Sequence, residues 1–147
     1  MGKDKVFVDS SILVTAVLSP LGGSFYIINN WRSRFEFQIN EYIFEETMRV
    51  LENKFSPQAH ALKNTLLLII GLASIKILKN PPPTRVRTLE KFISKEDAPI
   101  LASAIAFCSY LLTLDNDFFT DAVLRLSKKK GLIIIKPKEF ILSHRLQ

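Results

Sequence analysis

Acidic residues follow directly on two apolar stretches of this chain. Asp9 comes after residues 6–8 (VFV), and Asp115 and Asp117 come after residues 111–114 (LLTL). Short runs of β-branched and aromatic residues predict buried strands, so each acid stands where a predicted strand ends. Carboxylates that crowd together repel one another unless a cation holds them. Mg²⁺ and Mn²⁺ prefer oxygen ligands of this kind, and such sites support phosphodiester hydrolysis.

Asp97 is a further acid that the predicted elements bring to the same place. It stands in the first turn of the predicted helix 94–109, whose body is almost wholly apolar and which leads into the strand before Asp115. A crossover helix runs antiparallel to its strands, so its start lies at their carboxyl edge. We therefore expect Asp9, Asp97 and Asp115 to converge. Taken singly, Asp97 also fits a helix cap, and Asp115 or Asp117 a turn residue.

A glutamate from the predicted helix 41–55 is the other candidate member of this cluster. Glu45 and Glu46 are neighbours on that helix. Successive helical residues do not face the same side, so at most one of them points at the aspartates. The sequence leaves open which of the two does so.

The elements that must position these acids alternate between strand and helix. The predicted strands are 5–10, 35–40, 74–78, 110–114 and 131–137. The predicted helices are 11–19, 23–34, 41–55, 58–71, 94–109, 121–130 and 138–145, and residues 79–88, with three prolines, predict an extended loop. This alternation implies an α/β protein with a parallel sheet covered on both faces. Functional residues of such sheets gather at the carboxyl ends of the strands.

Length and composition narrow the class of protein. The 147 residues fit a single domain over residues 1–147. No apolar stretch reaches the roughly 20 residues that span a bilayer, and the start of the chain has no signal-peptide pattern, so we expect a cytoplasmic protein and no membrane partner. Cys108 is the one cysteine and forms neither an internal disulfide nor a cysteine metal site. The net charge of +6 favours a polyanionic partner such as nucleic acid.

Four segments, in order, resemble the PIN domain, the fold of VapC-type toxin ribonucleases. They are VFVDSSILVTAVLSPLGGS, FEETMRVL, EDAPILASAIAFCSYLLTLDNDFF and IIIKPKEFI, and the match runs from residue 5 to about residue 142. The resemblance implies a three-layer α/β/α fold with a central parallel sheet of about five strands. It also implies an endoribonuclease that uses Mg²⁺ or Mn²⁺ and cuts single-stranded or structured RNA. A toxin of this kind has an antitoxin protein as its partner and forms a homodimer or a higher homo-oligomer.

The resemblance assigns a role to each acid. The implied catalytic residues are Asp9, Glu46, Asp97, Asp115 and Asp117. Asp9, Asp97 and Asp115 would be the direct metal ligands, and Asp117 would act through water. Glu46 would be the helix glutamate of the family, with its neighbour at position 45 as the alternative.

Three hydroxyl residues complete the expected site. Ser10, Ser11 and Thr113 match positions that bind substrate or orient carboxylates and waters in the resembling family. The family often has asparagine where this chain has Ser11, and serine keeps a hydrogen-bond donor on a shorter side chain.

The sequence leaves other assignments open. A PIN-fold module that binds RNA or protein without cutting is the main alternative to a nuclease. Basic residues that would guide an RNA backbone, or form an ordinary solvated face, are Arg32, Arg34, Arg85, Arg87, Lys128, Lys129 and Lys130. His144, near the end of the chain, is expected on the surface.

Overall fold

The computed structural model describes residues 2–145 and contains one parallel five-stranded sheet. The strands are β1 (Asp4–Val8), β2 (Phe35–Asn40), β3 (Lys76–Leu78), β4 (Tyr110–Leu112) and β5 (Ile133–Ile135). Their order across the sheet is β3-β2-β1-β4-β5, and all four neighbouring pairs are parallel. The strand order therefore reverses at β1, where functional residues of open parallel sheets gather.

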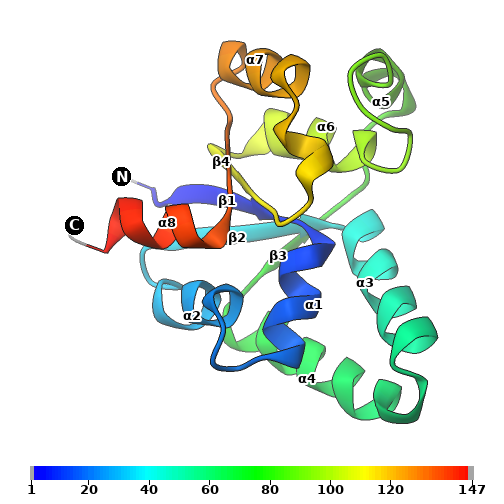
Figure 1. Cartoon of the computed structure of the whole chain (residues 1–147), viewed down its shortest axis with the longest axis vertical. Coiled ribbons are helices and arrows are strands. Elements are labelled where there is room, and N and C mark those ends of the chain that lie inside the picture. Colours follow the sequence, from blue (N-terminus) through cyan, green and yellow to red (C-terminus); the bar gives the residue numbers. More distant parts are fainter. Residues whose placement is uncertain (1, 146–147) are drawn as a thin grey trace.

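Helices cover both faces of the sheet. They are α1 (Ser10–Leu18), α2 (Gly23–Asn30), α3 (Glu41–Lys54), α4 (Ala59–Leu72), α5 (Pro83–Leu89), α6 (Ala98–Phe107), α7 (Asp121–Lys129) and α8 (Pro137–His144). Two short 3₁₀ turns, η1 (Ser56–Gln58) and η2 (Asn116–Phe119), complete the described elements. Figure 1 shows α5, α6 and α7 on one side of the sheet and α1 to α4 on the other. This arrangement confirms the predicted three-layer α/β/α fold with its central parallel sheet.

The sequence of β1 explains its central place. Val6, Phe7 and Val8 are fully buried, because β2 and β4 flank the strand and helices cover both of its faces. A strand buried on both sides reads as a continuous apolar run. Asp9 ends this run, so a carboxylate emerges at the middle of the carboxyl edge.

Asn40 fixes the start of α3 relative to α6. Its side-chain oxygen accepts a hydrogen bond from the Ile43 backbone N–H at 2.9 Å, which caps α3. Its amide nitrogen donates to the Ser103 hydroxyl at 2.9 Å and to the Pro99 carbonyl at 3.3 Å, both on α6. One fully buried side chain thus holds together the two helices that carry candidate acids.

Two expectations from the sequence were wrong. Residues 83–88, expected within the extended loop 79–88, belong to helix α5, because proline fits the first turn of a helix, where its missing N–H needs no partner. His144 is buried rather than on the surface, because α8 packs back against an aromatic cluster. The His144 ring lies 4.4 Å from the Phe140 ring centre and 5.1 Å from that of Phe35.

Within residues 2–145, no single helix is long and apolar enough to cross a membrane. The α1–α2 pair, bent by 96° at its break, reaches that length and composition only when its two helices are counted together.

Candidate metal centre

The five predicted acids come from four places around the carboxyl edge of the sheet. Asp9 follows β1 and caps α1, and Asp115 follows β4 and caps the turn η2, which contains Asp117. Asp97 precedes α6 as its N-cap residue rather than lying in its first turn, and Glu46 lies on α3. We call these five residues the acidic cluster.

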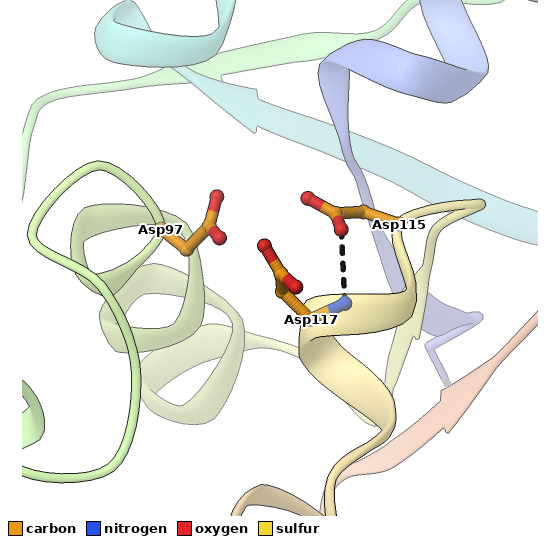
Figure 2. Close-up of side chains that lie close together, drawn as sticks. All are labelled: Asp97, Asp115 and Asp117. Atoms are coloured by element: carbon orange, nitrogen blue, oxygen red, sulfur yellow. Dashed lines mark hydrogen bonds between the residues drawn. The ribbon is translucent and has the colours of Figure 1, made fainter.

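Three members of the acidic cluster lie close enough to share one cation. Carboxylate oxygens of Asp97, Asp115 and Asp117 all lie within 4.8 Å of one another. Figure 2 shows the three side chains pointing toward a common space, with Asp97 opposite the two others. An Asp115 carboxylate oxygen accepts the Asp117 backbone N–H at 2.9 Å, and this bond shapes the turn η2. The Ser94 hydroxyl holds Asp97 in place by donating to Oδ2 at 3.1 Å.

Asp9 lies deeper, and three donors orient its carboxylate. Oδ1 accepts the Ser10 backbone N–H at 2.8 Å, and Oδ2 accepts the hydroxyls of Thr113 at 2.7 Å and Ser11 at 2.9 Å. Each of those two hydroxyls also accepts a backbone N–H after β4, from Asp115 at 3.0 Å for Thr113 and from Leu114 at 3.0 Å for Ser11. The two hydroxyls therefore tie the loop that carries Asp115 to the Asp9 carboxylate.

These contacts show what the hydroxyl residues do in the folded chain. Thr113 is fully buried, so its hydroxyl is available to the acids rather than to a solvent-borne ligand. Ser10 donates a hydrogen bond from its hydroxyl to Glu46 Oε1. In the structure, the hydroxyls of Ser10, Ser11 and Thr113 orient carboxylates. Substrate binding by these residues stays a prediction.

The structure also distinguishes the two neighbouring glutamates of α3. Glu46 lines the same hollow as Asp9, Asp97 and Asp115. Glu45 lines a separate hollow on the outer side of α3, with Phe44, Met48, Arg49 and Glu52. Glu46 is therefore the glutamate that faces the cluster.

Burial and mutual repulsion raise the pKa of several of these acids. The pKa of Asp97 rises to about 6, first because the carboxyl is half-buried and then because of the nearby Asp115, Asp9 and Asp117 charges. Burial is also the main cause of the raised pKa of Asp9 and of Glu46, with Asp115 adding to both. Carboxylates held together against their own repulsion, with oxygen atoms as the only donors, fit a hard divalent cation such as Mg²⁺ or Mn²⁺.

A cleft of about 410 Å³ opens onto the cluster and continues between α1 and α3. Its lining consists of Asp9, Ser10, Ser11, Val14, Thr15, Glu46, Val50, Lys54, Asp97, Leu114 and Asp115. We call it the acidic cleft. Lys54 is the one basic residue in this lining within residues 2–145, and sequence reasoning did not single it out. The sequence could have indicated Lys54, because it follows Glu46 by eight residues, about two helical turns, and so lies on the same face of the helix.

The basic residues that the sequence suggested for RNA contact lie elsewhere. Arg34 donates to the His144 carbonyl at 3.1 Å and lies over the Trp31 ring at 5.1 Å. Arg32 donates to the Leu72 carbonyl at 3.2 Å. Both arginines thus contact the packed part of the chain, and neither they nor the other suggested residues line the acidic cleft.

A parallel α/β sheet with carboxylates converging where its strand order reverses defines a recognisable class of protein. The family model of the PIN domain matches residues 5–117, and the chain belongs to this family. Members of the family are nucleases that use divalent metals. No curated protein gives a significant match to the sequence.

Solved structures with the same fold include proteins from three different organisms. VapBC2 from Rickettsia felis, bound to a DNA fragment from its promoter, is 15% identical with a TM-score of 0.66, covering 90% of this chain and 98% of that chain. PAE2754 from Pyrobaculum aerophilum is 17% identical with a TM-score of 0.67, covering 98% and 97%. FitAcB from Neisseria gonorrhoeae is 15% identical with a TM-score of 0.62, covering 90% and 98%. At these identities the likeness concerns the fold.

Replacing Thr113 with valine tests whether its hydroxyl organises the acids. The change removes the bridge between Asp9 and the Asp115 backbone while nearly keeping the volume. Partners that orient metal ligands contribute about 10- to 100-fold to affinity or activity, so we expect a loss of that size in Mg²⁺ affinity, measured by calorimetry. Thr113→Ser, which keeps the hydroxyl, is the control. Wild-type Mg²⁺ affinity in Thr113→Val would contradict this role.

The raised pKa of Asp97 makes a prediction for stability in EDTA. The folded pKa of about 6 exceeds the ordinary value of 3.8, so protonation of Asp97 stabilises the fold below about pH 4. This contribution is lost as the pH rises through about 6. Asp97→Asn removes the repulsion, so its unfolding free energy should exceed that of wild type increasingly between about pH 4 and pH 7. Urea unfolding at several pH values measures the difference. A difference that does not change with pH would contradict the assignment.

Proposed function

We propose that the protein is a metal-dependent nuclease, with RNA as its substrate, and that the acidic cluster is its active site. The observation that carries this proposal is the convergence of Asp97, Asp115 and Asp117 within 4.8 Å beside the buried Asp9. Membership of the PIN domain family supports the nuclease activity. The choice of RNA rests on the resemblance to VapC-type ribonucleases and on the net charge of +6.

Each residue has a role in this proposal. Asp97, Asp115 and Asp117 would hold a divalent cation, and the buried Asp9 would add a further negative charge beside it. When bound, Mg²⁺ or Mn²⁺ supplies a nucleophilic water and stabilises charge on the phosphate and the leaving oxygen. Ser11 and Thr113 hold Asp9 and the loop that carries Asp115 in fixed relative positions, so that the carboxylates need not reorganise during the reaction.

In this proposal Glu46 would take a proton from the attacking water. The Ser10 hydroxyl donates a hydrogen bond to its Oε1 atom and so helps to orient the carboxylate. Burial raises the pKa of Glu46, and a general base is most effective when its pKa approaches the working pH.

A cleavage assay tests the proposed activity. End-labelled single-stranded RNA, structured RNA and matched DNA would be incubated with Mg²⁺, Mn²⁺ or EDTA. We expect the protein to cut RNA in either metal and to stop in EDTA, leaving 5′-phosphate and 3′-hydroxyl ends. Cutting that persists in EDTA would overturn the metal-dependent mechanism. RNA binding without cutting in any metal would identify the non-catalytic binding module instead.

We further propose an antitoxin protein as a partner that covers the carboxyl edge. The VapBC and FitAcB structures share the fold and support this idea at the level of the family. An apolar hollow of about 580 Å³ between α1 and α8 borders the acidic cleft through Thr15 and Leu114. Inhibition of cleavage by the product of a neighbouring gene, weakened by Leu142→Glu in this hollow, would support the pairing.

A homodimer or higher homo-oligomer in the cytoplasm also belongs to this proposal. Helix α4 buries Leu66 and Ile69 but exposes Leu67, Leu68 and Leu72, which offers an apolar strip to a second copy. Light scattering of the wild type and of Leu68→Glu would show whether this strip joins subunits. A monomer in both would contradict the oligomer.

A further inference from the structure

Asp117 is the member of the acidic cluster whose position depends most on the backbone that carries it. It is exposed, and its carboxylate accepts no hydrogen bond from any residue in the described range 2–145. By contrast, Asp97 accepts the Ser94 hydroxyl, and Asp115 accepts the Asp117 backbone N–H. Figure 2 shows the Asp117 side chain projecting from the turn η2 toward the two other aspartates. The place of this carboxylate is therefore set by the position of η2.

Lys136, which follows β5, contacts both ends of η2. Its ammonium group donates a hydrogen bond to Asn116 Oδ1 at 2.9 Å and lies over the Phe119 ring, 5.1 Å from the ring centre. Asn116 is the first residue of η2 and Phe119 is the last. An ammonium group over the face of an aromatic ring is attracted to it. One side chain thus makes two contacts that lie on either side of Asp117 in the chain.

The backbone of Lys136 is itself fixed, at the point where β5 passes into α8. The Ile135 carbonyl accepts the Thr113 N–H at 3.1 Å, and the Lys136 carbonyl accepts the Phe140 N–H at 2.9 Å. On the inner side of η2, Phe118 is fully buried in the hydrophobic core. The turn is therefore anchored from two directions, by a buried ring on the inside and by the Lys136 ammonium group at the surface.

We propose that Lys136 is a positioning residue of the metal centre. By holding the two ends of η2, it keeps the Asp117 carboxylate within reach of a cation that Asp97 and Asp115 also bind. This inference rests on the proposed nuclease function and deepens it, because it adds a residue that acts through the turn and touches neither the cation nor the substrate.

The positive charge of Lys136 would by itself have the opposite effect on metal binding. A lysine near carboxylates repels a divalent cation, so removing the charge alone would strengthen binding of the cation. Removing the contacts with η2 would weaken binding, because the Asp117 carboxylate would no longer be held beside the two others. Asn116→Ala separates the two effects, since it breaks the hydrogen bond and leaves the charge in place.

Mn²⁺ binding tests the role of Lys136 independently of cleavage. Electron paramagnetic resonance of free Mn²⁺ would give the affinity of the wild type and of each variant. We expect Asn116→Ala and Lys136→Met each to bind about fivefold more weakly, less than the 10- to 100-fold effect of residues that bond to metal ligands directly. The double variant should bind no more weakly than Lys136→Met alone, because that single change already removes the contact with Asn116.

The matched control for the lost charge is Lys138→Met. Lys138 lies two residues along α8, is exposed, and has no hydrogen-bond or ion-pair partner among the described residues. The same chemical change there should leave the Mn²⁺ affinity within about twofold of the wild-type value.

Hydrogen exchange tests the position of η2 without any metal. The Asp117 backbone N–H is bonded to the Asp115 carboxylate, and local opening of the turn exposes it to water. In EDTA, nuclear magnetic resonance should show this N–H exchanging about fivefold faster in the two variants that break the contact, the change that contacts of this strength make in an opening equilibrium. The Asp9 N–H, which donates to the Leu112 carbonyl at 3.1 Å, should exchange at the wild-type rate, because the sheet is not loosened.

Two results would overturn the inference. One is a Mn²⁺ affinity that neither Asn116→Ala nor Lys136→Met lowers. The other is exchange of the Asp117 N–H at the wild-type rate in both variants. Failure of the proposed nuclease function looks different, because the wild-type protein then binds no Mn²⁺ or cuts no RNA, while the exchange measurement still decides whether Lys136 holds η2.

Discussion

Replacing Asp97 with asparagine is expected to abolish cleavage while leaving the fold intact. The change removes one of the three carboxylates that lie within 4.8 Å of one another, and with it a ligand of the cation. A catalytic metal contributes several kcal/mol, and each ~1.4 kcal/mol is tenfold in rate, so we expect a loss of at least about a hundredfold. Cleavage of labelled RNA in Mg²⁺ measures it, with circular dichroism and urea unfolding to confirm the fold.

The matched control for this variant is Asp121→Asn. Asp121 is an exposed acid in the first turn of α7 and does not line the acidic cleft. The same chemical change there should leave the rate within about twofold of wild type. Because contaminating ribonucleases would survive both substitutions, the three proteins should be purified identically. Undiminished cutting by Asp97→Asn would contradict the assignment of the site.

The second large loss of cleavage rate is expected from replacing Glu46, and its neighbour Glu45 provides the control. Glu46→Gln removes the carboxylate that faces Asp9 across the Ser10 hydroxyl, so no base remains at that position. We expect the rate to fall about 100-fold or more, in the range that a general base contributes. Glu45→Gln makes the same change on the outer side of α3 and should leave the rate nearly unchanged. Equal losses in the two variants, or a loss in Glu45→Gln alone, would contradict the orientation of α3.

Much of the fold follows from local patterns in the sequence. β1 and β4 carry buried apolar residues on both faces, so their continuous apolar runs are readable without the structure. Asp9 directly follows the first run, Asp115 follows the second after Thr113 and Leu114, and parallel strands end at one edge. The meeting of Asp9, Asp97 and Asp115 at one cleft therefore follows from element order alone.

Other features depend on packing between distant segments, which local patterns do not contain. Which of Glu45 and Glu46 faces the acidic cluster depends on how the capping residue Asn40 attaches α3 to α6. The burial of His144 depends on α8 reaching back to Phe35 and Tyr110. The hydroxyls that bridge Asp9 to the loop after β4 span more than a hundred positions, and only the folded chain brings them together.

Diffraction from crystals grown with Mn²⁺ would test the central claim most directly, because the anomalous signal locates the ion without reference to activity. We predict a Mn²⁺ ion between the carboxylates of Asp97, Asp115 and Asp117, on the side that faces Asp9, and no ion there in Asp97→Asn. An acidic cluster that stays without Mn²⁺ at millimolar concentrations, or an ion held only by residues outside it, would contradict the claim that these acids form the metal centre of a nuclease.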